Sequence, residues 1–167
     1  MVAGKAHVRH LIHVVPDGVD MQMTLTDPTD DAIDIEWGVT CVQVGDFAGA
    51  GSARDEADIR KCFIFTEHGL TTLDHTRRTE DAPYRGGQVY VPPAINPADV
   101  NERPLSPDVR VNGLIGCFSI DGRYLLATAW RPTERLFQGV IKCIHNDLRV
   151  GVWRLAKRNR RAEGSIC

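Results

Sequence analysis

The stretch "GLIGCFSIDGRYLLATAW", residues 113–130, carries the clearest structural signal in the chain. Its centre, Asp121-Gly122, is the two-residue signal for a type I′ β-hairpin, and apolar runs of similar length flank it. Pairing across this turn places Phe118 opposite Leu125. Both faces of the hairpin are largely apolar, so we expect central strands that are covered on each side, as in two stacked sheets.

A period of two in apolar residues continues on both sides of this hairpin and predicts further strands. The turn residues Pro16-Asp17-Gly18 join two alternating runs and predict a second hairpin. Convincing helical stripes are absent. We therefore expect an all-β fold, a two-sheet antiparallel β-sandwich in a single domain spanning residues 1–151. The remaining strands are expected at residues 7–15, 19–27, 32–44, 62–65, 70–73 and 135–145. In the third of these, the residues on one face are apolar: Ile33, Ile35, Trp37, Val39 and Cys41.

Composition limits the class of protein. The chain has 167 residues, 43% hydrophobic and 25% charged, with a formal net charge of −2, which is ordinary for a soluble globular domain. No apolar run approaches the roughly 20 residues that a transmembrane helix needs, so we expect no membrane span. The first residues lack the features of a secretory signal, and the compartment is left open. G-x-S-x-G, P-loop, GxGxxG and HExxH motifs do not occur.

Two features of the sequence bear on metal binding. The five cysteines are far apart, with no CxxC, and four of them lie in apolar runs where a free Cys is a small buried residue. His7, His10 and His13 are spaced H-x2-H-x2-H. On a strand, however, His10 points away from the other two, so the three cannot converge on one ion. We expect neither a metal nor another cofactor.

Residues 74–113 interrupt the strand pattern. This segment is polar, contains six of the nine prolines and offers only a brief strand at residues 88–91. Irregular loops of this length are usually functional lids or binding loops. Tyr84 and Arg85, near Tyr90, are candidate ligand contacts, and solvated loop residues are the alternative interpretation.

The corner "AWRPTERLFQG" brings four candidate binding residues together. Trp130, Arg131, Glu134 and Gln138 combine an aromatic ring with charged and amide groups, a set that suits a polyhydroxylated ligand. A surface corner with a half-buried Trp and an ion pair is the alternative.

The motif "CIHND", residues 143–147, places an imidazole, an amide and a carboxylate at a predicted strand end. His145 and Asp147 could act as a general acid/base pair, with Glu134 as a further carboxylate, or could hydrogen-bond sugar hydroxyls. A simple turn is the alternative, because Asn and Asp are turn formers.

Three stretches together resemble a known kind of protein. "NGLIGCFSIDGRYLLATAW…LFQGVIKCIHNDLRVG", "VTCVQVGDFAGAG" and "CFIFTEHG" are similar to uncharacterised bacterial proteins of the galactose-mutarotase-like β-sandwich type, over roughly residues 17–151. Sugar epimerases, polysaccharide lyases and glycosidase accessory domains use that fold. The resemblance implies a carbohydrate-binding or carbohydrate-active domain. A structural or interaction module without a small ligand is the other hypothesis.

The tail, residues 152–167, differs from the body of the chain. The last seventeen residues hold five basic residues and one acidic residue. One nucleotide restored after the Gly151 codon lets the same DNA read G-L-A-P-G-E-T-K-S-T-R-G-R-I-Y-L, a turn and strand typical of the resembled family. We therefore expect a frameshifted, non-native tail on a fragment that lacks a terminal strand, with self-association through exposed sheet edges. A solvated tail, a short helix over residues 152–161 and a nucleic-acid arm are the alternatives, and the lack of interleaved aromatic residues disfavours nucleic acid.

Overall fold

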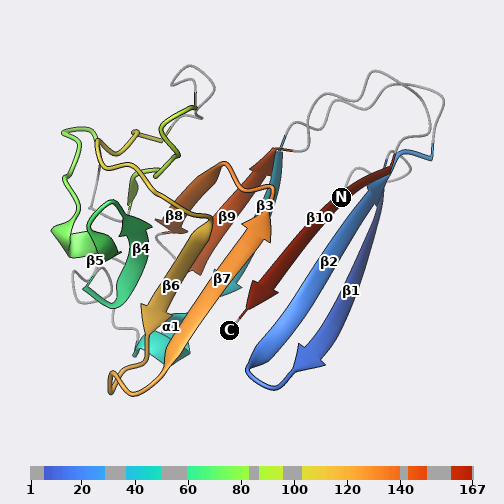
Figure 1. The fold of residues 1–167 in the computed structure, drawn as a ribbon, viewed down its shortest axis with the longest axis horizontal. Coiled ribbons are helices and arrows are strands. Elements are labelled where there is room, and N and C mark those ends of the chain that lie inside the picture. Colours follow the sequence, from blue (N-terminus) through green and yellow to red (C-terminus); the bar gives the residue numbers. More distant parts are fainter. Residues whose placement is uncertain are drawn as a thin grey trace.

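Two antiparallel β-sheets make up the computed structural model of the chain (Figure 1). The larger sheet has seven strands in the order β1-β2-β10-β7-β6-β4-β5, and the smaller has three in the order β3-β9-β8. This confirms the predicted all-β, two-sheet sandwich. The structure describes residues 6–28, 37–49, 60–82, 87–95, 103–139, 143–149 and 159–166. The elements are β1 (His7–Val15), β2 (Gly18–Thr26), β3 (Trp37–Gln43), α1 (Gly45–Ala48), β4 (Cys62–Thr66), β5 (Gly69–Thr72), the 3-10 turn η1 (Leu73–His75), β6 (Leu114–Phe118), β7 (Leu125–Arg131), β8 (Arg135–Gly139), β9 (Cys143–Arg149) and β10 (Asn159–Ile166).

The central hairpin, β6–β7, has the predicted register, with Phe118 opposite Leu125. Its turn differs in detail from a two-residue loop. The N–H of Gly122 donates to the carbonyl of Ser119 at 2.9 Å, and Gly122 has φ +68°. The Asp121 carboxylate accepts hydrogen bonds from the Ser119 hydroxyl and from the backbone N–H of Arg123. These two bonds lower the pKa of Asp121. Glycine therefore reverses the chain at the place the sequence indicated, through a turn that starts earlier.

The main core lies between the two sheets. Ile64, Ile115 and Cys117 from the seven-stranded sheet meet Leu136 and Ile144 from the three-stranded sheet, and all five are buried. Alternate residues of each strand point into this layer, which is why the period of two predicted the strands correctly.

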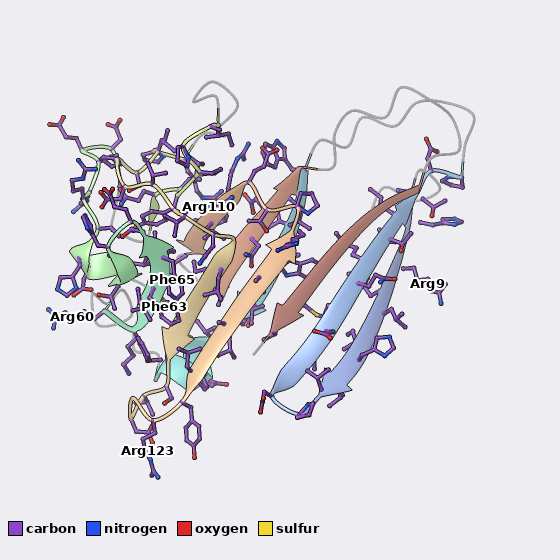
Figure 2. The ribbon with its side chains drawn as sticks, in the orientation of Figure 1. Arg9, Arg60, Phe63, Phe65, Arg110 and Arg123 are labelled. Atoms are coloured by element: carbon purple, nitrogen blue, oxygen red, sulfur yellow. The ribbon has the colours of Figure 1, made fainter. Side chains whose placement is uncertain are left out.

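The outer face of the central hairpin is only partly covered, which differs from the expectation. Phe63 lies over it next to Phe118, with 5.1 Å between ring centroids, and Phe65 follows on the same strand (Figure 2). Leu125 of β7, the register partner of Phe118, is nevertheless 46% exposed. The aromatic cluster therefore covers this face only in part.

The run at residues 135–145 forms two strands where one was predicted. β8 and β9 pair antiparallel, with Gly139 opposite Cys143. Apolar residues on both sides of Gly139 hide the chain reversal, because both strands contribute alternate residues to the same core. Asn146 and Asp147 lie inside β9, so they do not form a turn.

β3 turns the predicted apolar face outward. Trp37, Val39 and Cys41 alternate with residues that face the core, and Val39 is 56% exposed. Ile33 and Ile35 lie outside the described residues. Cys41 is therefore exposed, contrary to expectation, whereas the described cysteines Cys62, Cys117 and Cys143 are buried as predicted.

The segment 74–113 is held by a buried polar centre where it is described. The side-chain amide of Gln88 donates to the Arg77 carbonyl at 2.7 Å and to the Tyr90 hydroxyl and Ser106 Oγ at 3.2 Å. A brief strand was predicted at residues 88–91. The structure has isolated β-bridges there instead, and one of them joins Tyr90 to Leu136. Tyr90 is fully buried, so it is a core residue rather than a solvated loop residue.

Residues 159–166 form β10, a strand that the sequence analysis did not predict. β10 lies between β2 and β7 and pairs antiparallel with both (Figure 1). Gly164 stands opposite Trp130 in this register. The frameshifted origin of the tail stays a prediction that sequencing of the gene tests.

Candidate functional site

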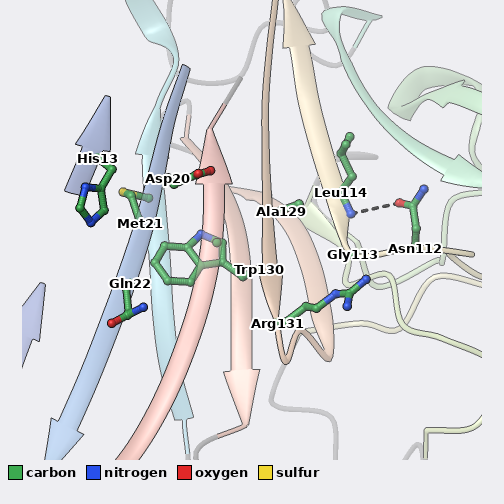
Figure 3. Close-up of a pocket in the computed structure, with 11 residues that line it drawn as sticks. His13, Asp20, Met21, Gln22, Asn112, Gly113, Leu114, Ala129, Trp130 and Arg131 are labelled. Atoms are coloured by element: carbon green, nitrogen blue, oxygen red, sulfur yellow. Dashed lines mark hydrogen bonds between the residues drawn. The ribbon is translucent and has the colours of Figure 1, made fainter. Parts of the chain in front are cut away.

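A groove crosses the seven-stranded sheet where β2, β10 and β7 meet (Figure 3). Its volume is about 710 Å³, within the roughly 300–1,000 Å³ range of small-molecule sites. Four parts of the chain line it. They are the β1–β2 hairpin, strand β7, strand β10, and the segment that leads into β6 together with the first residue of β6. The lining residues are His13, Asp20, Met21, Gln22, Asn112, Gly113, Leu114, Ala129, Trp130, Arg131 and Gly164.

Strand register explains why these residues meet. His13 of β1 stands opposite Asp20 of β2 in the strand register. The same row of register partners runs on through β10 to Ala129 of β7 and Leu114 of β6, so it crosses five strands. Gln22 and Arg131 are each paired with the same residue of β10, two positions along the sheet. Side chains two positions apart share a face, so this row and its neighbour present their groups on the same side.

The polar lining offers several kinds of hydrogen-bonding groups. Asp20 is an acceptor, Arg131 is a cationic donor, and Gln22 both donates and accepts. Asp20, Arg131, His13 and Asn112 are exposed, whereas Gln22 is half-buried. Convergent donors and acceptors in an open groove are the chemistry that recognises a ligand with several hydroxyl or carboxyl groups.

Trp130 forms part of the groove wall but is not the exposed aromatic platform that the sequence suggested. It is 4% exposed and packs with Leu148, Met21 and Met23. Its ring lies against β10 at Gly164, where an added Cβ would come within 2.3 Å of the Trp130 Cδ2 atom. The indole N–H has no hydrogen-bond acceptor among the described residues. Glycine at position 164 is thus what lets the ring fit.

Arg110 fixes the rim of the groove. It is 4% exposed, and its two terminal nitrogens donate to the carbonyls of Asn112 at 2.7 Å and Thr133 at 2.5 Å (Figure 2). Burial lowers its pKa to about 10, while the charge of Glu134 acts in the opposite direction. A charged side chain thus ties the end of the 74–113 segment to the β7–β8 turn.

His145 and Asp147 lie elsewhere, on the outer face of the three-stranded sheet. Both alternate with residues of β9 that face the core. The His145 ring stacks on Phe137 with 4.1 Å between centroids and 12° between planes. The Arg103 guanidinium lies 4.2 Å from the centroid of the same Phe137 ring.

Burial dominates the electrostatics of this face. It lowers the pKa of His145 to about 4, and the charge of Arg103 adds to the effect. It raises the pKa of Asp147 to about 6, although Arg135 and Arg103 favour the carboxylate. Arg135 stands opposite Asp147 in the register and lies 3.3 Å from the centroid of the Trp37 ring. The imidazole is accordingly neutral at pH 7.

Four further sequence-predicted candidates remain. Gln138 is buried on the core side of β8, opposite Ile144. Glu134 donates its backbone N–H to the Asp147 carbonyl at 2.9 Å. Tyr84 and Arg85 lie outside the described residues. The structure thus places Trp130 and Arg131 in the groove and His145 and Asp147 on the other sheet.

Several groove residues were missed by the sequence analysis. His13, Asp20 and Gln22 looked like ordinary strand residues, and only the insertion of β10 between β2 and β7 brings them near Arg131. Asn112 stands at the end of the 74–113 segment, which the sequence predicts to be a functional lid or binding loop.

Comparisons with protein-family models, with curated proteins and with solved structures found no match to this chain. No helix in the described parts of the chain is both long and apolar enough to span a membrane.

Proposed function

We propose that the groove on the seven-stranded sheet binds a carbohydrate. The observation that carries the proposal is its lining, in which a carboxylate, an amide and a guanidinium face one open volume of about 710 Å³. Asp20, Gln22 and Arg131 supply the paired donors and acceptors that vicinal hydroxyl groups require. The resemblance of residues 17–151 to galactose-mutarotase-like sandwiches favours the same ligand class.

Trp130 and Met21 also line the groove, but they support the sheet there and do not contact the ligand. By strand alternation their side chains point to the face opposite the polar lining residues, and they pack with Leu148 of the other sheet. The proposal concerns recognition alone, because His145 and Asp147 lie on the other sheet.

A thermal-shift screen of mono- and oligosaccharides, followed by titration calorimetry on the best ligand, tests the proposal. Binding stabilises the native state, so a true ligand raises Tm in a concentration-dependent way. Arg131→Ala removes a charged hydrogen bond and should weaken binding by about 10-fold or more, since such a bond contributes about 1.5–3 kcal/mol. Arg123→Ala is the matched control, because Arg123 is an exposed arginine of the β6–β7 turn, outside the groove (Figure 2).

Two outcomes would contradict the proposal. One is that no saccharide raises Tm. The other is that Arg131→Ala and Arg123→Ala bind the same sugar with equal affinity.

A second candidate function, self-association through β1, has its own observation. β1 ends the seven-stranded sheet and bears Val8, Ile12 and Val14 at 51%, 59% and 85% exposure. An open edge with apolar side chains is a template for strand addition. Sedimentation velocity should show dimers that Ile12→Lys dissociates and Ile120→Lys, an exposed isoleucine in the β6–β7 turn, does not.

A further inference from the structure

Three metal-ligating side chains meet on the outer face of the three-stranded sheet. Cys41 of β3 is the register partner of His145 of β9, and Cys143 stands two residues earlier on β9. The two sulfur atoms and one imidazole nitrogen all lie within 4.8 Å of one another. The Cys143 Sγ and His145 Nε2 atoms are the closest pair, at 2.6 Å.

We propose that Cys41, Cys143 and His145 form a zinc-binding site. Two thiolates and an imidazole are a preferred ligand set for Zn²⁺, with Zn–S distances of about 2.3 Å and Zn–N distances of about 2.0–2.1 Å. In a tetrahedral complex such ligand atoms stand roughly 3.6 Å apart. The Cys143 Sγ to His145 Nε2 distance, 2.6 Å, would have to increase by about 1 Å to reach that separation.

The surroundings of the cluster favour a fixed site. The His145 ring is held by its stack on Phe137, so the direction of its nitrogen atoms is set by packing. Cys143 is buried and Cys41 is exposed, which gives the ion one anchored ligand and a path from solvent. Three protein ligands leave the fourth tetrahedral position for water or a substrate atom, as in catalytic zinc sites.

The cross-strand geometry explains why the sequence did not indicate this site. A CxxC motif places both cysteines in one loop, whereas here the cysteines stand on different strands, Cys41 on β3 and Cys143 on β9. The site is independent of the sugar-binding groove, since the two involve different sheets.

Zinc binding to the reduced full-length chain tests the proposal. We expect one Zn²⁺ per chain by elemental analysis after removal of loosely bound metal, and a thiolate-to-metal charge-transfer band when Co²⁺ replaces Zn²⁺. Cys41→Ser is the main variant, because Cys41 is exposed and its replacement leaves the core intact. Its zinc affinity, measured by competition with a chromophoric chelator, should fall by about 100-fold or more, exceeding the 10–100-fold typical of outer-shell changes.

Matched controls separate ligation from general damage. Cys117→Ala changes a buried thiol of the core, and His68→Gln changes an exposed histidine of the β4–β5 turn. Both should keep the wild-type stoichiometry and the cobalt spectrum, with far-UV circular dichroism showing that each variant is folded. A reduced protein that takes up no zinc overturns the proposal. So does zinc binding of wild-type affinity in the folded double variant Cys41→Ser/His145→Gln.

Discussion

Replacement of Gly116 by alanine should destabilise the fold strongly, because the centre of β6 has no room for a side chain. A Cβ atom there would lie 2.5 Å from the Cζ atom of Phe63 and 2.8 Å from the carbonyl oxygen of Leu126. The Phe63 ring is 1% exposed and is confined by Phe65 and Phe118. The oxygen belongs to the strand paired with β6, so it moves only if the hairpin distorts.

The expected cost follows from these two contacts. Overpacking of a well-filled site costs about 1–3 kcal/mol, and a clash with the backbone places Gly116→Ala in the upper part, at about 2–3 kcal/mol. For a domain of this size each kcal/mol lowers Tm by about 2–4 °C, so Tm should fall by roughly 4–12 °C. Urea unfolding followed by far-UV circular dichroism gives the free energy directly, with an unchanged m-value.

A double-mutant cycle identifies the ring as one cause. Phe63→Leu removes the ring atoms that an alanine methyl would strike, so the combined cost of Gly116→Ala and Phe63→Leu should be less than additive by about 0.5 kcal/mol or more. Part of the cost should remain, because the Leu126 oxygen is still in place. The reasoning is refuted if Gly116→Ala unfolds within about 0.5 kcal/mol of the wild type, or if the two substitutions are additive.

Three further predictions concern a turn glycine, a buried arginine and the cysteines. Gly122→Ala should lower the free energy of unfolding by about 1 kcal/mol, because Gly122 has φ +68°. The loss should be smaller than for Gly116→Ala, because nothing lies within 4 Å of a Cβ added at Gly122. Equal losses for the two variants in urea unfolding would contradict this. Arg110→Met should lower the free energy of unfolding by about 1–3 kcal/mol, since it leaves the partly buried carbonyls of Asn112 and Thr133 without their charged donor, and a neutral result in the same assay would rule out that anchoring role. Iodoacetamide should modify Cys41 in the native protein well before Cys117, because burial raises the pKa of the Cys117 thiol to about 12; peptide mapping that finds equal labelling would be incompatible with the described burial.

Much of the strand pattern could be predicted because it depends on neighbours in the chain. The β6–β7 register follows from Asp121-Gly122, and the β1–β2 hairpin from the turn at Pro16-Asp17. Each depends on alternation and on a residue type that reverses the chain. The β8–β9 reversal was missed because the run around Gly139 is mostly apolar and carries no strong turn motif.

The candidate site was predicted less well, because its members come from strands distant in sequence. Arg131 was identified from its local motif, and it does line the groove. Its partners Asp20 and Gln22 have no local signal, since a polar residue on a strand is usually just solvated. Trp130 was singled out for its ring, which the structure buries against Gly164.

The sequence by itself determined the class of fold, the main hairpins and the burial of Cys62 and Cys117, since alternation and turn chemistry act over a few residues. Only the tertiary structure decided which strands are neighbours. The insertion of β10 between β2 and β7 creates the groove, and the pairing of β3 with β9 sets Cys41 opposite His145. Such neighbours depend on how two sheets bury their apolar faces together, which is a property of the whole chain and of no single segment.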